Sequence, residues 1–93
     1  MNLEIVYSKN ADRFLSENAN RITESEVDDL IVRAVKKILK IEEAAMDIKA
    51  LKGEYRGYFR IRKGKIRIVF SLKRNEISVA FIRAIDFRKD VYK

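Results

Sequence analysis

Apolar and polar positions along the chain follow two periodicities, one of about two residues and one of about 3.6. Leu3, Ile5 and Tyr7 occupy alternate positions, which predicts a short N-terminal strand. Over residues 9–18 apolar side chains recur at helical spacing, with Asn18 as a plausible stop residue. The chain is therefore predicted to begin with a strand followed by a helix.

A longer helix is predicted after Thr23. Thr23 and Glu26 have the spacing of a capping box, in which each side chain satisfies a backbone N–H of the other residue. Seven apolar residues then recur with the helical period: Val27, Leu30, Ile31, Ala34, Val35, Ile38 and Leu39. Acidic residues crowd the start and lysines the end, which complements the helix dipole. The two helices are predicted to form an antiparallel hairpin that covers a sheet.

The rest of the chain is rich in strand patterns. After a connection through residues 42–53, strands are predicted over residues 55–62, 65–73 and 76–85, and residues 86–93 form a short tail. This element order predicts an α+β fold: an N-terminal strand, a two-helix hairpin and a three-stranded antiparallel meander, with the helices packed on one sheet face.

The stretch "YFRIRKGKIRIVF" sets the register of the first hairpin. If Lys63 and Gly64 are the two loop residues, Arg60 faces Arg67, and Arg62 faces Lys65. The same register predicts a core face made of Phe59, Ile61, Ile66 and Ile68. Like charges directly across a ladder are destabilising, so two such pairs suggest that an anion binds there. A solvated basic face with side chains splayed into water is the alternative.

The second hairpin is predicted to turn at residues 74–75. That turn sets the pairs that extend the core face, Leu72 with Ile77 and Phe70 with Val79. It also places Arg83 on the core side unless a β-bulge turns it over. Such a bulge could aim Arg83 toward Arg60 and Arg67.

Length and composition indicate one small domain spanning residues 1–93 with a single core. The absence of Cys excludes a disulfide framework and fits a reducing compartment. Neither a signal-peptide pattern nor an apolar run of membrane-spanning length is present. We therefore expect a soluble cytoplasmic protein with no membrane association.

Charge is unevenly distributed along the chain. The net charge is +7, and residues 1–50 carry eight Lys and Arg against ten Asp and Glu. Residues 51–93 carry thirteen against four. This concentration of positive charge points to a polyanionic partner such as a nucleic acid.

Several kinds of chemistry are excluded by residue type. The chain has no His, which excludes Ser-His-Asp and Cys-His sites and histidine metal ligands. Its three Gly match no nucleotide-binding loop, and its acidic residues show no metal-ligand spacing, so we expect no cofactor and no metal. Arg, Lys and Tyr remain, and these suit phosphate recognition and metal-free RNA cleavage with the ribose hydroxyl as nucleophile. A non-catalytic RNA or DNA binder would carry the same set.

Two segments resemble the RelE/ParE toxin superfamily of bacterial and archaeal toxin–antitoxin systems. They are "LKGEYRGYFRIRKGKIRIVF" over residues 51–70 and "FRKDVYK" over residues 87–93, and the resemblance extends to the element order of the whole chain. For the RelE branch it implies an mRNA interferase, a ribosome-dependent endoribonuclease that cuts mRNA in the ribosomal A site and so inhibits translation. It also implies a cognate antitoxin protein that neutralises the toxin.

The resemblance implies roles for particular residues. The basic catalytic residue of the family falls on Arg60 and the phosphate-stabilising arginine on Arg67. Tyr92 matches the C-terminal tyrosine that stacks on the substrate base, and Arg88 matches the arginine of the common His-Arg-x-x-Val-Tyr ending. Together with Arg83 these residues form the expected catalytic set. Lys52, Tyr58, Arg62 and Lys65 are expected to bind RNA.

The sequence departs from the family pattern at two positions near its end. Phe87 replaces the histidine of the common ending, and Asp86 replaces a further arginine, whose place Arg83 or Arg88 could take. Because an arginine stays protonated, the resemblance leaves the proton acceptor unidentified.

Two other interpretations stay open. A ParE-like toxin would bind and inhibit DNA gyrase without a nuclease site, and the missing His and Asp86 favour it. A basic nucleic-acid-binding module without toxin activity is the third possibility. The basic half of the chain and the predicted Arg60/Arg67 pair favour the mRNA interferase.

Overall fold

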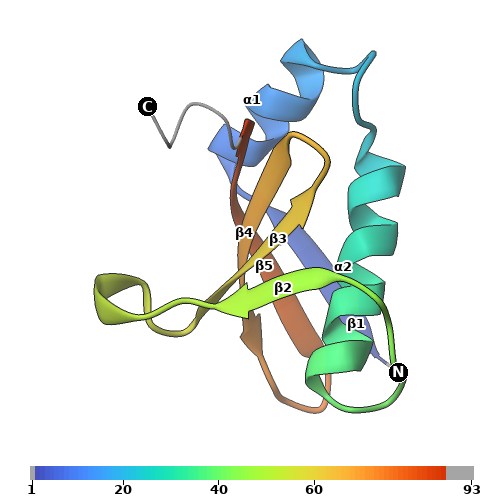
Figure 1. The fold of residues 1–93 in the computed structure, drawn as a ribbon, viewed down its shortest axis with the longest axis vertical. Helices are drawn as coiled ribbons and strands as arrows, with labels where there is room; N and C mark the ends of the chain where they lie inside the picture. Colours follow the sequence, from blue (N-terminus) through green and yellow to red (C-terminus); the bar gives the residue numbers. More distant parts are fainter. Residues whose placement is uncertain (1, 88–93) are drawn as a thin grey trace.

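The computed structural model describes residues 2–87, which form two α-helices packed on one face of a five-stranded sheet (Figure 1). The elements are β1 (Leu3–Tyr7), α1 (Lys9–Glu17), α2 (Glu24–Ile38), β2 (Asp47–Ala50), a short 3₁₀ helix η1 (Gly53–Tyr55), β3 (Tyr58–Lys63), β4 (Ile66–Lys73) and β5 (Ser78–Phe87). The predicted α+β fold is confirmed. One strand, β2, is not predicted from the sequence; it lies within the predicted connection and pairs with β3.

The sheet is mixed and has the strand order β1-β5-β4-β3-β2. β1 runs parallel to β5, and the other neighbours are antiparallel. In Figure 1 the chain between β2 and β3, residues 51–57, projects away from the sheet on the side opposite α2. In the strand order given above, β1 and β2 are the two edge strands of the sheet.

Both helices begin at side-chain caps. The Ser8 hydroxyl accepts a hydrogen bond from the backbone N–H of Ala11 at 3.1 Å. At α2 the predicted capping box is present: Thr23 Oγ1 accepts from the Glu26 N–H at 3.1 Å, and Glu26 Oε1 accepts from the Thr23 N–H at 2.9 Å. Within the described residues, no helix is long and apolar enough to cross a membrane.

One hydrophobic core lies between the helices and the sheet. The largest fully buried side chains are Phe70, Ile31, Ile61, Ile68, Ile82, Ile85, Val27 and Val35. Phe59 stacks on Phe70 with a centroid separation of 5.6 Å. The predicted apolar stripe of α2 therefore faces the inner side of β3, β4 and β5.

The first hairpin turns one residue later than predicted. Lys63 pairs with Ile66, so Gly64 and Lys65 are the loop residues. Gly64 has a φ of 59°, which fits the first central position of a tight hairpin turn. Glycine takes this conformation without the steric penalty that a Cβ would bring.

This later turn changes the cross-strand partners but not the faces. Arg62 faces Arg67, and Arg60 faces Val69, so the predicted Arg60/Arg67 and Arg62/Lys65 pairs are wrong. Every partner moves by two positions, and a shift of two keeps each side chain on the same face. The predicted inward-facing set on these strands is therefore confirmed, and one like-charged pair replaces the expected two.

The second hairpin differs more. Its last pair is Lys73 with Val79, so residues 74–78 lie between the paired strands, three more than predicted. The pairs in the structure are Leu72 with Ala80 and Phe70 with Ile82. Ile77, predicted to lie in the core, is 55% exposed. This odd shift in register exchanges the two faces of the strand, so side chains in the first half of β5 lie on the face opposite to the predicted one.

A β-bulge in β5 returns the residues after Arg83 to the sheet faces that the sequence predicts for them. Val69 pairs with Ala84 and Phe70 with Ile82, which leaves Arg83 as the extra residue between them. The bulge keeps the apolar residues on both sides of it on the core face. Arg83 lies on the outer face and is exposed, as expected if a bulge is present.

Tyr7 makes a polar contact between β1 and α2. Its hydroxyl donates to Asp28 Oδ1 at 2.6 Å in a part-buried position. Burial raises the pKa of Tyr7 far above its ordinary value, and the hydrogen bond to Asp28 and the negative charges of Asp28, Glu24 and Asp12 raise this pKa further. The neutral phenol is therefore strongly favoured in the folded state.

A pH dependence of stability follows from Tyr7. Because its pKa is raised on folding, its contribution is complete below the unfolded-state pKa, about 10, and is lost as pH rises beyond it. We expect Tyr7→Phe to lower the unfolding free energy by about 1–3 kcal/mol at pH 7, through loss of the bond to Asp28. Above pH 10 the wild type should lose stability more steeply than the variant. Urea unfolding of both proteins between pH 7 and 11 measures the loss at pH 7 and the slope above pH 10. Parallel pH profiles for the wild type and the variant would contradict a raised pKa of Tyr7.

Candidate functional site

A row of four charged residues crosses the outer face of the sheet. Asp47 on β2 faces Arg62 on β3, Arg62 faces Arg67 on β4, and Arg67 faces Asp86 on β5. Directly opposed residues share a face, and their neighbours Ile61, Ile68 and Ile85 point into the core. The row therefore lies on the face turned away from the helices.

Each arginine of the row has its own carboxylate. Arg67 Nε donates to Asp86 Oδ1 at 3.0 Å and Arg67 Nη2 to Asp86 Oδ2 at 2.8 Å, which is a two-pronged contact. Arg62 Nε donates to Asp47 Oδ2 at 2.9 Å. The protein thus supplies acidic partners to the like-charged Arg62/Arg67 pair, which explains how this pair is tolerated.

Arg60 lies in a different environment from the one its expected role requires. The residue is only 8% exposed, and its Nη2 is 3.5 Å from Asp47 Oδ1. Its Nη1 is buried and has no hydrogen-bond partner among the described residues. Arg60 is therefore a nearly buried cation with a weak ion pair, which is costly unless something else requires it.

This cost can be measured. Replacing a buried, poorly paired ion by an apolar residue of similar length is often neutral or stabilising by about 1–4 kcal/mol. We expect Arg60→Met to have an unfolding free energy equal to or above that of the wild type. Asp47 also accepts a hydrogen bond from Arg62, and we expect this bond to persist in the variant. Urea denaturation checks the expectation, and a clear destabilisation would show that Arg60 has a structural role.

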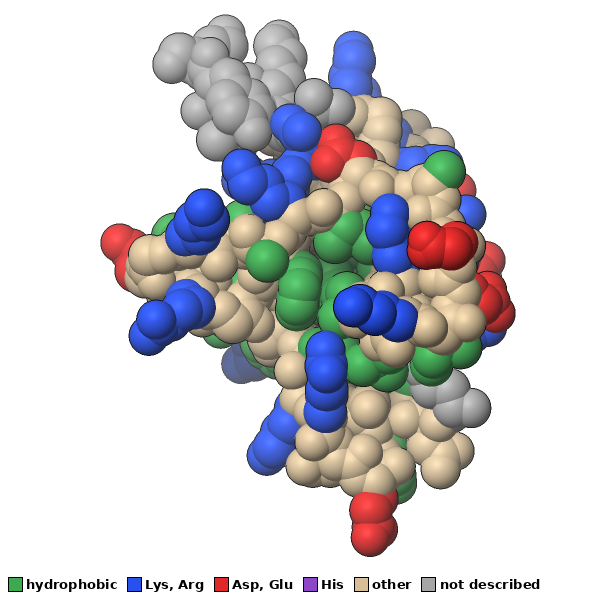
Figure 2. All heavy atoms as spheres, turned by 60° about the horizontal axis from the view of Figure 1, so that its bottom comes forward, with side chains coloured by type: hydrophobic (Ala, Val, Ile, Leu, Met, Phe, Trp, Pro, Cys, Tyr) green, Lys and Arg blue, Asp and Glu red, His purple; other side chains and the backbone are tan. Residues whose placement is uncertain are grey.

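A cavity of about 490 Å³ opens beside the Arg67–Asp86 pair. The described residues that line it are Leu51, Tyr55, Arg67, Val69, Arg83, Ala84 and Asp86. In Figure 2 the projecting segment 51–57 lies at the left, and hydrophobic side chains gather beside it with Lys and Arg around them. The cavity thus combines an apolar wall with two guanidinium groups and one carboxylate.

Arg83 connects the cavity to Tyr58. Its guanidinium carbon lies 5.4 Å from the centre of the Tyr58 ring, and its Nη1 donates to the Tyr58 hydroxyl at 3.4 Å. The bulge in β5 puts Arg83 on the same face as Arg67. Two cations beside an apolar wall suit a nucleotide, with the phosphate near the guanidinium groups and the base on the wall.

The structure brings together only part of the predicted site. Arg67 and Arg83 line the cavity, and Tyr58 contacts Arg83. Arg62 shares a sheet face with Arg67, whereas Arg60 lies nearly buried beneath the outer surface. Arg88 and Tyr92 lie outside the described residues.

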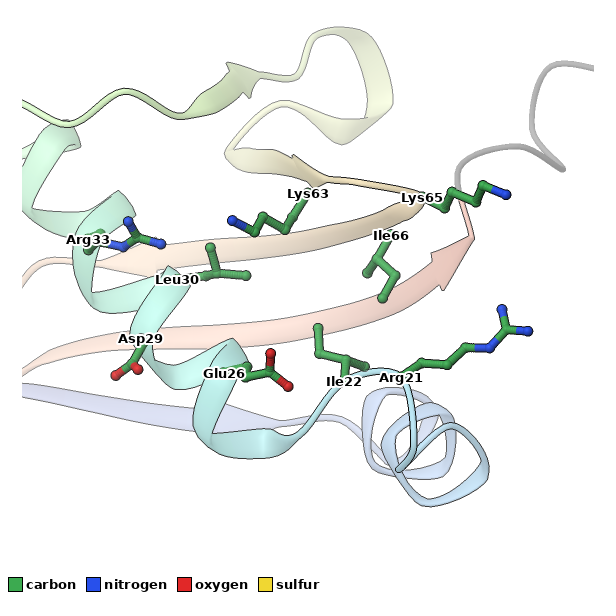
Figure 3. A pocket seen from close by; sticks show the side chains of 9 residues that line it. All are labelled: Arg21, Ile22, Glu26, Asp29, Leu30, Arg33, Lys63, Lys65 and Ile66. Atoms are coloured by element: carbon green, nitrogen blue, oxygen red, sulfur yellow. The ribbon is translucent and has the colours of Figure 1, made fainter.

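Neither of the remaining two lysines lines this cavity. Lys52 is exposed in the projecting segment. Lys65 is in the turn of the first hairpin and lines a second cavity, of about 430 Å³, between this turn and the start of α2. Figure 3 shows Lys63 extending toward α2, which carries Glu26 and Asp29, while Lys65 extends away from the helix. Two arginines, Arg21 and Arg33, also line this second cavity, but the described residues around it include two carboxylates and no aromatic residue.

Sequence reasoning missed four residues of this region, of which Asp86, Tyr55 and Leu51 line the first cavity and Asp47 does not. Asp47 falls within the predicted connection and Asp86 within the predicted tail, so the sequence predicts no ion pair with an arginine for either. Tyr55 and Leu51 were treated as strand and connection residues, yet both line the cavity. The signal for Asp86 was available, because Ile85 and Phe87 flank it in strand-like alternation. The described residues contain no group of three or more His, Cys, Asp or Glu side chains able to hold a metal ion.

Comparison with solved structures shows the fold. YafQ from E. coli strain BL21(DE3) is 12% identical, with a TM-score of 0.67 over 97% of this chain and 98% of that chain. A YoeB/ParE toxin from Agrobacterium tumefaciens is 18% identical, with a TM-score of 0.65 over 90% and 97%. RelE in the RelB–RelE antitoxin–toxin complex from Methanococcus jannaschii is 19% identical, with a TM-score of 0.53 over 94% of both chains. No protein-family model and no curated protein matches the chain.

Proposed function

We propose that this chain, whose fold is that of the RelE/ParE-type toxins, is the toxin of a type II toxin–antitoxin system and cleaves mRNA on the ribosome. The observation that carries the proposal is the cavity on the outer sheet face. There Arg67 and Arg83 stand beside an apolar wall that includes Tyr55. The second cavity also has two arginines, but no aromatic residue is among the described residues that line it.

The cavity suits cleavage of an RNA phosphodiester. Arg67 is held by Asp86 in a fixed orientation, so its positive charge is in place before a phosphate arrives. Negative charge that develops on the phosphate oxygens during attack by the ribose 2′-hydroxyl would be stabilised by this guanidinium. Tyr55, which is 47% exposed, offers a face on which a base can stack.

The expected partners are mRNA, the ribosome and an antitoxin. A net charge of +7, concentrated in residues 51–93, favours association with ribosomal RNA and mRNA. Structural neighbours that were solved as toxin–antitoxin complexes, among them RelB–RelE, RelBE2 and DinJ–YafQ, support a cognate antitoxin for this chain. We expect that coexpression of this antitoxin restores growth to cells that produce the protein.

Mapping of mRNA ends after induction tests the proposed activity. New 5′ ends should arise inside translated reading frames soon after the protein is induced. The same message without its ribosome-binding site serves as the control, and it should stay intact. Growth arrest with intact translated messages would overturn the proposal.

A second candidate function is inhibition of DNA gyrase. The two-pronged contact of Asp86 offsets the charge of Arg67, and the chain has no His, which together favour a toxin without a nuclease site. Under this alternative, purified protein would block supercoiling by gyrase in the absence of ribosomes. Our proposal predicts that supercoiling continues unchanged.

A further inference from the structure

We propose that Asp86 is the general base of the cleavage reaction and takes the proton from the ribose 2′-hydroxyl. This inference rests on the proposed nuclease function and goes beyond it, since it assigns the proton acceptor. The position carries an aspartate where the family resemblance leads one to expect an arginine. The structure places this aspartate beside the very arginine expected to hold the phosphate.

The chemistry of the cavity requires an acceptor, and few side chains qualify. The chain has no His, and an arginine stays protonated at every relevant pH. Of the described residues that line the cavity, Asp86 is the only carboxylate. A carboxylate is acceptor-only when ionised, so it can receive a proton without first losing one.

The geometry holds Asp86 ready for this role. Its two oxygens are fixed by Arg67 at 3.0 and 2.8 Å, which sets the plane of the carboxylate. The side chain is 45% exposed, so a substrate hydroxyl can reach it. Two carboxylate oxygens offer about four lone-pair sites, and the contact with Arg67 uses two of them.

Arg67 and Asp86 are close enough to act on one nucleotide. Arg67 and Asp86 both line the cavity, so a phosphate bound there at Arg67 lies beside the carboxylate. A phosphate at Arg67 would therefore bring the adjacent 2′-hydroxyl to the same end of the cavity as Asp86. The pair then places a charge stabiliser and a proton acceptor side by side.

The step balances without any further reagent. The Asp86 carboxylate takes the 2′-hydroxyl proton, and the electron pair of that O–H bond lets the 2′-oxygen form a bond to phosphorus. The bond between phosphorus and the 5′-oxygen breaks, and the 5′-oxygen leaves with its electron pair and takes a proton from water. The products are a 2′,3′-cyclic phosphate and a 5′-hydroxyl end.

Asp47 provides a matched comparison within the same row. It also pairs with an arginine across a strand boundary, with 2.9 Å between its Oδ2 and Arg62 Nε. Its side chain is exposed to a similar degree, 47% against 45% for Asp86. Asp47 does not line the cavity beside Arg67. Asp47→Asn and Asp86→Asn therefore each remove one negative charge from the row, although Asp47 also lies 3.5 Å from Arg60, and only the second removes the proposed acceptor.

The test is single-turnover cleavage of ribosome-bound mRNA by purified wild type, Asp86→Asn, Asp86→Glu and Asp47→Asn. We expect Asp86→Asn to lower the rate by about 10²–10⁴-fold, the usual contribution of a general base. Its cosedimentation with ribosomes should equal or exceed that of the wild type, because the basic face loses a negative charge. Asp86→Glu should recover a substantial part of the rate, and Asp47→Asn should lose less than tenfold.

The outcomes separate this inference from the proposed function. If the wild type cleaves and Asp86→Asn cleaves at a similar or higher rate, Asp86 restrains Arg67 and is not the base. The assignment would also be overturned if Asp86→Glu and Asp86→Asn were equally inactive while thermal unfolding measurements showed that both variants are folded. If Asp86→Asn does not fold, retained cleavage by Asp86→Glu supports the assignment and its loss refutes it. A wild type that leaves ribosome-bound mRNA intact refutes the nuclease function itself.

Discussion

Arg67→Ala is expected to reduce mRNA cleavage on ribosomes by about 100-fold or more, the range found when one donor that stabilises developing charge is removed. The reason is that Arg67 is the guanidinium fixed in the cavity by two hydrogen bonds to Asp86. Growth of cells that produce the variant should be close to normal. Cleavage by purified protein on programmed ribosomes measures the rate directly.

Arg74→Ala is the control for this experiment. It removes the same functional group from an exposed position in the loop that follows β4, outside the cavity. Net charge falls by one unit in both variants, so a general electrostatic effect on ribosome binding would act on both alike. Undiminished cleavage by Arg67→Ala would show that the cavity is not the site of reaction.

Phe70→Ala is expected to lower the unfolding free energy by about 3–5 kcal/mol, the cost of truncating a buried aromatic side chain. Phe70 is 0% exposed and stacks on Phe59 at the centre of the core. Since small domains are stable by only about 5–15 kcal/mol, a large part of the protein would unfold near body temperature. Urea denaturation monitored by circular dichroism gives the value.

Phe81→Ala is the matched comparison for Phe70→Ala. Phe81 lies on the neighbouring strand β5 and is only partly buried, and its partner in β4 is Ser71. Its truncation should cost less than half as much, because less apolar area is removed from contact. Equal losses in the two variants would mean that the core does not lie on the face of the sheet covered by the helices.

The helices could be predicted from sequence because their signals are local. The capping box of Thr23 and Glu26 and the period of the following stripe lie within one element, and both are confirmed. The face of the first hairpin was also predictable, since alternation decides it regardless of the turn. These signals need no knowledge of distant partners.

The sheet pairing was less predictable because it depends on loops. Lys63–Gly64 and Gly64–Lys65 are both acceptable turns, and a choice between them moves every cross-strand partner by two positions. In the second hairpin no Gly marks the turn, and the longer loop placed Ile77 in solvent. β2 has four residues with a mostly exposed pattern, so its alternation carried little signal.

The candidate site was predicted in part for the same reason. Arg67 is predicted from the alternation of the first hairpin and from the resemblance, and Arg83 from a possible bulge in β5, which the structure contains. Arg60 is predicted as part of the site by the same hairpin register and by the resemblance, and nothing in its sequence context indicates that it is nearly buried. Asp47 and Asp86 belong to strands whose extent was misjudged, so their ion pairs could not be foreseen.

The central claim is that the cavity at Arg67 cleaves RNA presented by a ribosome. Its most direct test is incubation of purified protein with one defined mRNA, free in solution and bound in programmed ribosomes. The account predicts cleavage of the ribosome-bound message, with a 2′,3′-cyclic phosphate at the new end, and little cleavage of the free message. An intact message in both conditions, under protein concentrations that arrest growth, would contradict it.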